Sequence, residues 1–121
     1  MSRLTLYAHP KCTTCAAARD WLRARGVAFV EKDIRAAPPS VPELRAVLKA
    51  ADGKLSRISN TSGIEYRAQG LAAKLSVLDE AGALRLLATN GMFVKRPLLV
   101  GPGVAVAGFK APAWAAALDG K

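Results

Sequence analysis

The chain has 121 residues, of which 51% are hydrophobic and 22% are charged. This composition can form a buried core and excludes an intrinsically disordered chain, and two cysteines exclude a disulfide-rich secreted scaffold. The apolar stretches fall short of the roughly 20 residues that span a bilayer, and the start lacks the apolar core of a signal peptide. We therefore expect a cytoplasmic protein that does not enter a membrane.

The basic excess is spread along the chain. Residues 1–60 hold 11 Lys and Arg against 5 Asp and Glu, and residues 61–121 hold 7 against 4. The chain has no long run of like charges, and its aromatic residues are not interleaved with basic ones as stacking on nucleic acid requires. We interpret the net charge of +9 as a distributed basic surface and expect no direct binding to nucleic acid.

The first third of the chain predicts a strand, a helix and a second strand. Residues 3–8 are rich in apolar and β-favouring side chains and end before a proline. Residues 13–25 show helical spacing and stop at Gly26, and residues 27–32 contain the β-favouring run Val-Ala-Phe-Val. This βαβ order within about 30 residues has the size of a parallel crossover unit.

A helical segment is predicted for the middle of the chain, about residues 40–89. Ser40 and Glu43 have the spacing of a capping box, in which each side chain satisfies a backbone amide of the helix start. Behind them, apolar residues recur at helical spacing. These signals predict a helix over residues 41–51.

The same signals predict two shorter helices later in this segment. Ser62 and Glu65 repeat the capping-box spacing ahead of a helix that ends at Gly70. Residues 80–88 stop before an Asn-Gly pair and predict the second helix. The middle of the chain is therefore expected to insert helices between two halves that contain strands.

The last third of the chain returns to β structure. Residues 97–100 and 104–107 are short apolar runs joined by Gly-Pro-Gly, which predicts two strands with a tight turn. Pro112 suits the first turn of a closing helix that ends at Leu118. The order βαβ, helices, ββα predicts an α/β fold in a single domain of residues 1–121.

The strongest chemical signal is the pair Cys12 and Cys15 at the start of the first predicted helix. A helix N-terminus carries partial positive charge and unpaired amides, which stabilise a thiolate and lower the pKa of a cysteine. Lys11 offers further positive charge. Residues three apart lie on neighbouring turns, so Cys15 can attack a mixed disulfide formed on Cys12. The pattern predicts Cys12 as the nucleophilic thiol and Cys15 as the resolving thiol.

Two other interpretations of the cysteine pair stay open. Tetrahedral zinc usually needs four protein ligands, and two cysteines with the one histidine, His9, would require carboxylates or a second chain. The pair can also be two incidental reduced cysteines. We predict no metal site, because the usual ligand pairs are absent from the sequence.

Lys95, Arg96 and Pro97 precede the third predicted strand. The simplest interpretation is that the proline only marks the start of the strand, since a proline at the first residue removes no central hydrogen bond of the sheet. The functional interpretation is a cis proline that shapes a substrate groove beside Cys12. In this interpretation the two-pronged guanidinium of Arg96 binds an anion. About 5–6% of X–Pro bonds in folded proteins are cis, so the sequence by itself does not favour the cis form.

Three segments match a known pattern in the same order. They are Pro10-Lys11-Cys12-Thr13-Thr14-Cys15, Asn60-Thr61-Ser62-Gly63 and Lys95-Arg96-Pro97-Leu98-Leu99-Val100. With them the chain resembles the arsenate reductase/Spx/MgsR family over essentially its whole length. The resemblance implies a thioredoxin-like fold, with a mixed four-stranded sheet and a helical insertion between the βαβ and ββα halves.

The resemblance to the arsenate reductases implies that Cys12 attacks arsenate and that glutathione with glutaredoxin completes the reduction. Three arginines hold the oxyanion in those enzymes. Arg96 matches one of them, Lys110 stands near the position of another, and the segment Asn60-Thr61-Ser62 has no arginine for the remaining one. Lysine lacks the bidentate fork of arginine, so these departures argue against efficient arsenate reduction.

The Cys-x-x-Cys pair instead resembles the Spx and MgsR regulators, which bind RNA polymerase and sense oxidation through that pair. We expect a thiol–disulfide redox protein that acts on a small oxyanion such as arsenate or on a thiol or disulfide partner. It would bind no cofactor and use glutathione with glutaredoxin, or thioredoxin, as external reductant. The alternative is a redox-sensing regulator that binds RNA polymerase. The predicted site residues are Cys12 and Cys15 as catalytic thiols and Lys11, Arg96, Pro97 and Lys110 for substrate binding.

Overall fold

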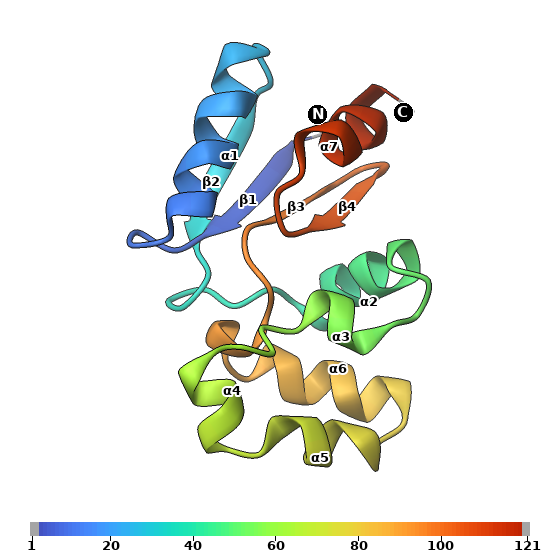
Figure 1. Cartoon of the computed structure of the whole chain (residues 1–121). Coiled ribbons are helices and arrows are strands. Elements are labelled where there is room, and N and C mark those ends of the chain that lie inside the picture. Colours follow the sequence, from blue (N-terminus) through green and yellow to red (C-terminus); the bar gives the residue numbers. More distant parts are fainter. Residues whose placement is uncertain (1–2, 120–121) are drawn as a thin grey trace.

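The computed structural model describes residues 3–119 and contains a mixed sheet of four strands (Figure 1). The strands are β1 (Leu4–Ala8), β2 (Phe29–Asp33), β3 (Leu98–Gly101) and β4 (Val104–Ala107). Their order is β2-β1-β3-β4, with β1 parallel to β2 and antiparallel to β3, and with β3 antiparallel to β4. The predicted α/β class and the βαβ and ββα halves are confirmed, and the two halves join where β1 pairs with β3.

Helices cover both faces of this sheet. On one face lie α1 (Thr13–Ala24) and α7 (Ala111–Asp119), and on the other lies α2 (Val41–Ala50). The remaining helical segments are α3 (Leu55–Ile58), α4 (Ile64–Ala68), α5 (Leu71–Ser76), α6 (Glu80–Ala88) and the 3-10 turn η1 (Gly91–Phe93). Figure 1 shows α3 to α6 gathered below the sheet, at the end away from the two termini.

Alternation along the strands divides the buried side chains into two clusters. We call the cluster under α1 and α7 the cysteine core, and its buried members are Leu4, Leu6, Ala8, Cys15, Ala18, Leu22, Leu99, Val104 and Trp114. We call the other cluster the insertion core; Tyr7, Leu98 and Val100 from the sheet meet buried residues of α2 to α6 there. Neighbouring residues such as Leu6 and Tyr7 point to opposite faces because side chains alternate along a strand.

The predicted capping box at the start of α2 is confirmed. The Glu43 N–H donates to Ser40 Oγ at 3.3 Å, and the Ser40 N–H donates to Glu43 Oε1 at 2.9 Å. The same carboxylate oxygen accepts a hydrogen bond from the Tyr7 hydroxyl of β1 at 2.8 Å. Glu43 therefore both caps α2 and ties this helix to the sheet.

The capping box expected at Ser62 and Glu65 is wrong. The N-cap of α4 is Gly63, and it makes no side-chain capping bond. Glu65 instead accepts hydrogen bonds from Asn90 and Arg35, so its carboxylate is drawn away from the helix start. Contacts far apart in the sequence override the local capping signal here.

Other differences are smaller. β2 begins at Phe29 rather than at residue 27, and α3, α5 and η1 were not expected from the sequence. α5 follows directly after Gly70, whose φ of 59° lies in the left-handed region that glycine adopts readily. These short elements lack the length that makes a periodic apolar pattern recognisable.

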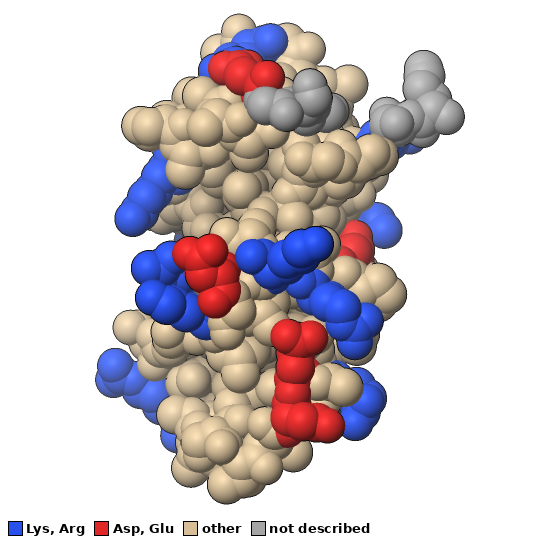
Figure 2. Space-filling view, turned by 90° about the vertical axis from the view of Figure 1, so that its right-hand side faces the viewer, with Lys and Arg blue, Asp and Glu red and all other residues tan. Residues whose placement is uncertain are grey.

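The surface agrees with a distributed charge. On the face shown in Figure 2, Lys and Arg side chains lie in small groups with acidic and uncharged side chains between them. Five ion pairs join described residues, for example Arg19 with Glu31 and Arg45 with Glu80. Within residues 3–119, every helix is too short or too polar to cross a bilayer.

Candidate functional site

Cys12 is the N-cap residue of α1. Its backbone is extended, with φ −90° and ψ 115°, and its N–H donates to the carbonyl oxygen of His9 at 3.1 Å. The backbone N–H of Cys15 donates to Cys12 Sγ at 3.2 Å. A side-chain oxygen usually accepts this bond at a helix start, and here a sulfur takes its place. The Cys12 sulfur therefore lies in the positive field of the α1 N-terminus.

The two cysteines differ in accessibility. Both are free thiols, and Cys12 is half-buried whereas Cys15 is 0% exposed. Cys15 packs with Ala18 and Leu22 of α1 in the cysteine core. An incoming substrate can therefore reach Cys12, while Cys15 is shielded from solvent.

The surroundings shift the pKa values of the two thiols in opposite directions. Burial by itself raises the pKa of Cys12. Hydrogen bonds from Cys15, together with a hydrogen bond and the positive charge of Arg96, outweigh burial, so the net pKa of Cys12 is lowered. Burial raises the pKa of Cys15, and its hydrogen bond with Cys12 raises it further. When the pair loses one proton, the negative charge therefore lies on Cys12 and the remaining proton on Cys15.

Arg96 comes to Cys12 from the segment before β3. Its guanidinium also donates from Nη1 to the thioether Sδ of Met92 at 3.4 Å. The Arg96–Pro97 peptide bond is cis, and the carbonyl oxygen of Pro97 accepts a hydrogen bond from the Gly108 N–H at 2.8 Å. Arg96 thus lies between the cysteine pair and the helical insertion.

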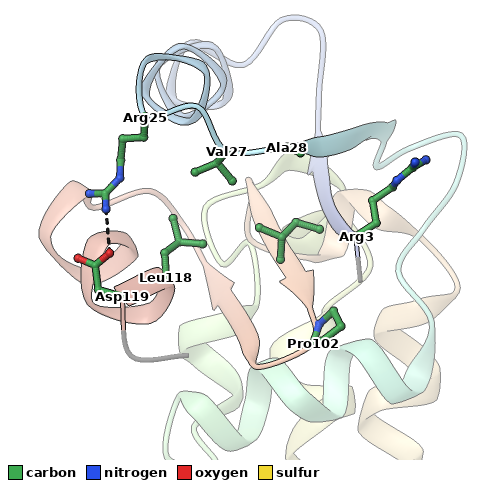
Figure 3. Close-up of a pocket in the computed structure, with 8 residues that line it drawn as sticks. Arg3, Arg25, Val27, Ala28, Pro102, Leu118 and Asp119 are labelled. Carbon is green, nitrogen blue, oxygen red and sulfur yellow. Dashed lines mark hydrogen bonds and ion pairs between the residues drawn. The ribbon is translucent and has the colours of Figure 1, made fainter. Parts of the chain in front are cut away.

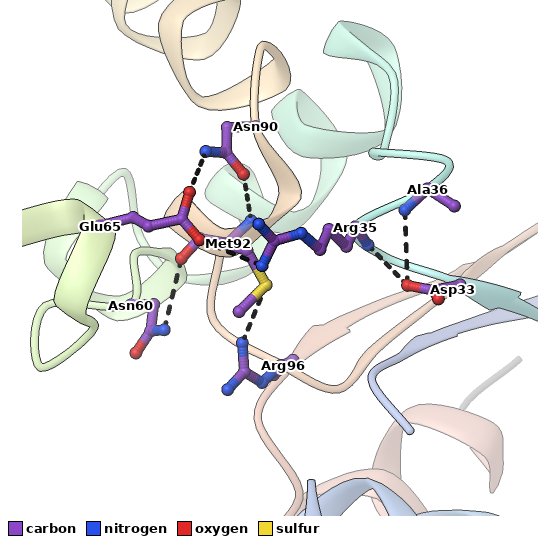
Figure 4. Close-up of polar contacts among 8 residues, drawn as sticks. All are labelled: Asp33, Arg35, Ala36, Asn60, Glu65, Asn90, Met92 and Arg96. Atoms are coloured by element: carbon purple, nitrogen blue, oxygen red, sulfur yellow. Dashed lines mark hydrogen bonds and ion pairs between the residues drawn. The ribbon is translucent and has the colours of Figure 1, made fainter. Parts of the chain in front are cut away.

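A polar network around Met92 supports this arrangement (Figure 4). Asn90 Oδ1 accepts from the Met92 N–H at 2.9 Å, and Asn60 Nδ2 donates to the Met92 carbonyl oxygen at 3.3 Å. Asn90 Nδ2 also donates to Glu65 at 2.8 Å, and Glu65 pairs with Arg35 at 3.3 Å. Sequence reasoning missed Met92, Asn90 and Glu65, because contacts across three separate segments leave no local pattern.

Lys11 and His9 lie in the turn between β1 and α1. The Lys11 backbone N–H donates to His9 Nδ1 at 3.2 Å, and Lys11 is exposed. His9 is partly buried and contributes its carbonyl oxygen to the turn that presents Cys12. Lys11 is thus next to Cys12 in the chain, at the open side of the site. Within residues 3–119, no group of three or more His, Cys, Asp or Glu side chains is placed to hold a metal ion.

Lys110 is the remaining basic residue predicted for the site. It lines a groove of about 470 Å³ along β4, together with Lys95 and Arg57. Cys12 and Arg96 are not among the residues that line this groove. Of the basic residues predicted for the site, Arg96 is the one whose hydrogen bond and charge lower the pKa of Cys12, whereas Lys110 lines this groove.

A second cavity, of about 330 Å³, lies where β1 begins (Figure 3). Arg3, Arg25 and Leu118 are among its lining residues, and Arg25 pairs with Asp119 at 2.9 Å across its mouth. Cys12 follows the opposite end of β1. This cavity therefore takes no part in the chemistry of the cysteine pair.

Fold and site together define a class of protein. A mixed sheet of order β2-β1-β3-β4 carries a Cys-x-x-Cys pair at the first turn of α1, with a lowered pKa on the first thiol. This combination is that of a thiol redox protein with a thioredoxin-like fold.

The chain belongs to the ArsC family, whose model matches residues 7–117. It is 41% identical over 107 residues to the uncharacterised protein YusI of Bacillus subtilis, covering 88% of this chain and 91% of YusI. It is 34% identical over 97 residues to the global transcriptional regulator Spx of Enterococcus faecalis, covering 80% of this chain and 72% of Spx. The expected relation to arsenate reductases and Spx regulators is confirmed.

A solved structure agrees with the fold. The crystal structure of "a possible arsenate reductase" from Streptococcus mutans superposes with a TM-score of 0.81 at 39% sequence identity. The match covers 92% of this chain and 94% of that one. The fold described above is therefore shared with this solved structure over nearly its whole length.

Proposed function

We propose that this protein is a thiol–disulfide oxidoreductase in which Cys12 is the nucleophile and Cys15 the resolving thiol. The observation that carries the proposal is the environment of Cys12. Its sulfur accepts a hydrogen bond from the Cys15 N–H at the start of α1, and the Arg96 guanidinium further lowers its pKa. A thiolate at a positively charged helix start is the reactive form in sulfur exchange.

The first step is attack of the Cys12 thiolate on one sulfur of a substrate disulfide. A bond forms between Cys12 Sγ and that sulfur, the substrate S–S bond breaks, and the departing thiolate takes a proton from water. Arg96 is positioned to stabilise negative charge near the attacking sulfur. The result is a mixed disulfide between Cys12 and the substrate.

The second step uses Cys15. Once Cys12 is bound in a disulfide, it no longer raises the pKa of Cys15 by its charge, so Cys15 can lose its proton more readily. The Cys15 thiolate attacks Cys12 Sγ, the substrate leaves as a thiolate that takes up a proton, and a Cys12–Cys15 disulfide remains. Two electrons from glutathione with glutaredoxin, or from thioredoxin, restore both thiols; the cytosol supplies these reductants.

Single cysteine variants test this division of roles. Cys15→Ser is expected to accumulate a mixed disulfide with a small disulfide substrate, because the resolving thiol is absent. Cys12→Ser is expected to form none, because the remaining thiol is buried with a raised pKa. Mass spectrometry after brief incubation gives the adduct yield. An adduct that forms in Cys12→Ser and not in Cys15→Ser would contradict the proposal.

Reduction of a small oxyanion such as arsenate is a narrower form of the same proposal. Its support is the 39% identity to the structure described as a possible arsenate reductase and the presence of Arg96 near Cys12. Lys11 and Pro97 are the further substrate-binding candidates, whereas Lys110, also predicted from the sequence, lines the groove along β4. A coupled assay with arsenate, glutathione and glutaredoxin is expected to give turnover that Cys12→Ser abolishes. If the wild-type protein gives no turnover, the oxyanion role is excluded and disulfide exchange remains.

The second candidate is a redox-sensing regulator that binds RNA polymerase, with disulfide formation as its switch. The similarity to Spx, which covers 80% of this chain, favours it. Purified RNA polymerase is expected to retain the protein in one oxidation state of the cysteine pair and less well in the other. Failure to bind in both the reduced and the oxidised state removes this candidate.

A further inference from the structure

β4 is an edge strand. It pairs with β3 on one side, and it is the last strand in the order β2-β1-β3-β4. The Gly108 N–H donates to the Pro97 carbonyl oxygen at 2.8 Å, which marks the residue pair 97 and 108 as hydrogen-bonded. Because hydrogen-bonded and non-hydrogen-bonded pairs alternate in an antiparallel ladder, Val106 directs its N–H and C=O toward β3. Ala105 and Ala107 then direct theirs away from β3, to the free edge of the sheet.

A groove runs along this free edge. Three consecutive β4 residues, Ala105–Ala107, line the groove, whose volume is about 470 Å³. One wall is formed by Val47 and Ala51 at the end of α2, and the other by Ala113 and Trp114 of α7. The two helices come from opposite faces of the sheet. The groove therefore opens in the plane of the sheet, where an added strand would lie, and the small alanine side chains allow another backbone to approach.

The charged side chains around the groove are all basic. Arg57, Lys95 and Lys110 line it, and no acidic residue is among its lining. The Lys95 stem lies over Gly108 at the end of β4, since a Cβ there would be 2.9 Å from Lys95 Cε. Arg57 also contacts the exposed carboxylate of Asp52 at 3.7 Å, and a surface pair of this kind is weak. Lysine at a sheet edge commonly discourages pairing with other strands, and it does so least toward acidic ones.

We propose that the β4 groove binds an extended acidic segment of a partner protein as a fifth strand of the sheet. The outward N–H and C=O groups of Ala105 and Ala107 would pair with the backbone of that segment, which is how strand addition gains affinity. Carboxylates on the segment would meet Arg57, Lys95 and Lys110 at the groove rim. A second copy of this chain does not fit the same description, because each copy carries a net charge of +9 and would present the same basic rim.

This inference goes beyond the thiol chemistry of Cys12. Cys12, Cys15 and Arg96 do not line the groove. The groove and the redox site are nevertheless adjacent in the chain, because Lys95 of the groove directly precedes Arg96. Binding at β4 and reactivity of Cys12 can therefore be measured separately, and failure of one does not imply failure of the other.

The test uses the full chain and a dye-labelled peptide of about ten residues that alternates Thr and Glu. Fluorescence anisotropy is expected to show saturable binding, and the same peptide with Lys in place of Glu is expected not to bind. The variant Lys95→Glu with Lys110→Glu is expected to weaken binding about tenfold or more, because it reverses two of the three rim charges. The matched control is Lys74→Glu with Arg85→Glu, which changes the net charge equally on exposed positions of α5 and α6. Equal loss in both variants would show non-specific attraction and overturn the proposal.

Two further measurements separate strand addition from simple charge attraction. Two peptides are N-methylated at alternate residues, one at the odd and one at the even positions, so each lacks the N–H donors along one of its two edges. At least one of them is expected to bind about tenfold or more weakly than the unmodified peptide. Hydrogen exchange is expected to slow at the Ala105 and Ala107 amides when the unmodified peptide binds. Unchanged exchange at both amides, N-methylated peptides that both bind as tightly as the unmodified one, or a stable dimer that buries the β4 edge would each contradict the proposal.

Discussion

The cysteine core and the insertion core are built on the same strands but contribute differently to the site. The cysteine core holds Cys15 and supports α1, whose start presents Cys12. In the segments between α3 and β3, Asn60, Asn90 and Met92 form the network that contacts Arg96. The difference shows that the thiols depend on one face of the sheet, whereas the cation that stabilises the thiolate is held from the other.

The sharpest way to separate the two regions is to weaken each core by one side chain. Leu22 of α1 and Leu84 of α6 are both 0% exposed. Replacing either with Ala is expected to lower the free energy of unfolding by about 2–5 kcal/mol, measured by urea denaturation. In the folded state, only Leu22→Ala is expected to slow alkylation of Cys12, because it loosens the helix that carries both thiols. Equal slowing in Leu84→Ala would contradict this separation.

Removal of Arg96 tests the contribution from the insertion side. Arg96 lowers the pKa of Cys12 through a hydrogen bond and its charge, so Arg96→Ala is expected to raise that pKa. The rate of iodoacetamide alkylation at pH 7 is expected to fall several-fold, because less of the thiol is ionised at that pH. Arg96→Lys should retain part of the rate, since it keeps the charge without the fork. Arg57→Ala, a basic residue of the β4 groove, serves as control and should leave the rate unchanged.

Much of this arrangement could be predicted from the sequence, because its signals are local. The Cys-x-x-Cys spacing after a strand placed Cys12 at a helix start, and Ser40 with Glu43 correctly predicted the capping box of α2. The contact between Arg96 and Met92 could not be predicted, because it depends on how the segment before β3 packs against η1. The capping box predicted from the spacing of Ser62 and Glu65 was wrong for the same reason, because the Glu65 carboxylate accepts hydrogen bonds from Arg35 and Asn90 instead.

A smaller effect is expected where the sheet is tied to α2. Tyr7 is buried in the insertion core, and its hydroxyl donates to Glu43 at 2.8 Å. Tyr7→Phe removes this bond and is expected to cost about 1 kcal/mol of unfolding free energy. Glu43 still accepts the Ser40 N–H, so α2 keeps its cap. An unchanged urea midpoint would show that the hydroxyl does not link the sheet to the insertion.

The smallest effect is expected from Met92, which acts on Cys12 only through Arg96. Met92→Leu keeps the side-chain volume but removes the sulfur that accepts from Arg96 Nη1. We expect about a threefold slower alkylation of Cys12 at pH 7, with a nearly unchanged urea midpoint. In an Arg96→Ala background the same substitution is expected to have no further effect. Additive losses would mean that Met92 acts on Cys12 by another route.

The measurement that tests the central claim most directly is the pH dependence of Cys12 alkylation in the native protein. Alkylation requires the thiolate, so a lowered pKa moves the midpoint of the rate profile to lower pH. The hydrogen bonds from Cys15 and Arg96 predict a midpoint below about 8.5, the value of a free cysteine, and below that of the same chain unfolded in guanidinium. Cys15 is expected to stay unmodified over this range because burial raises its pKa. A native midpoint at or above about 8.5 would contradict the assignment of Cys12 as the nucleophile.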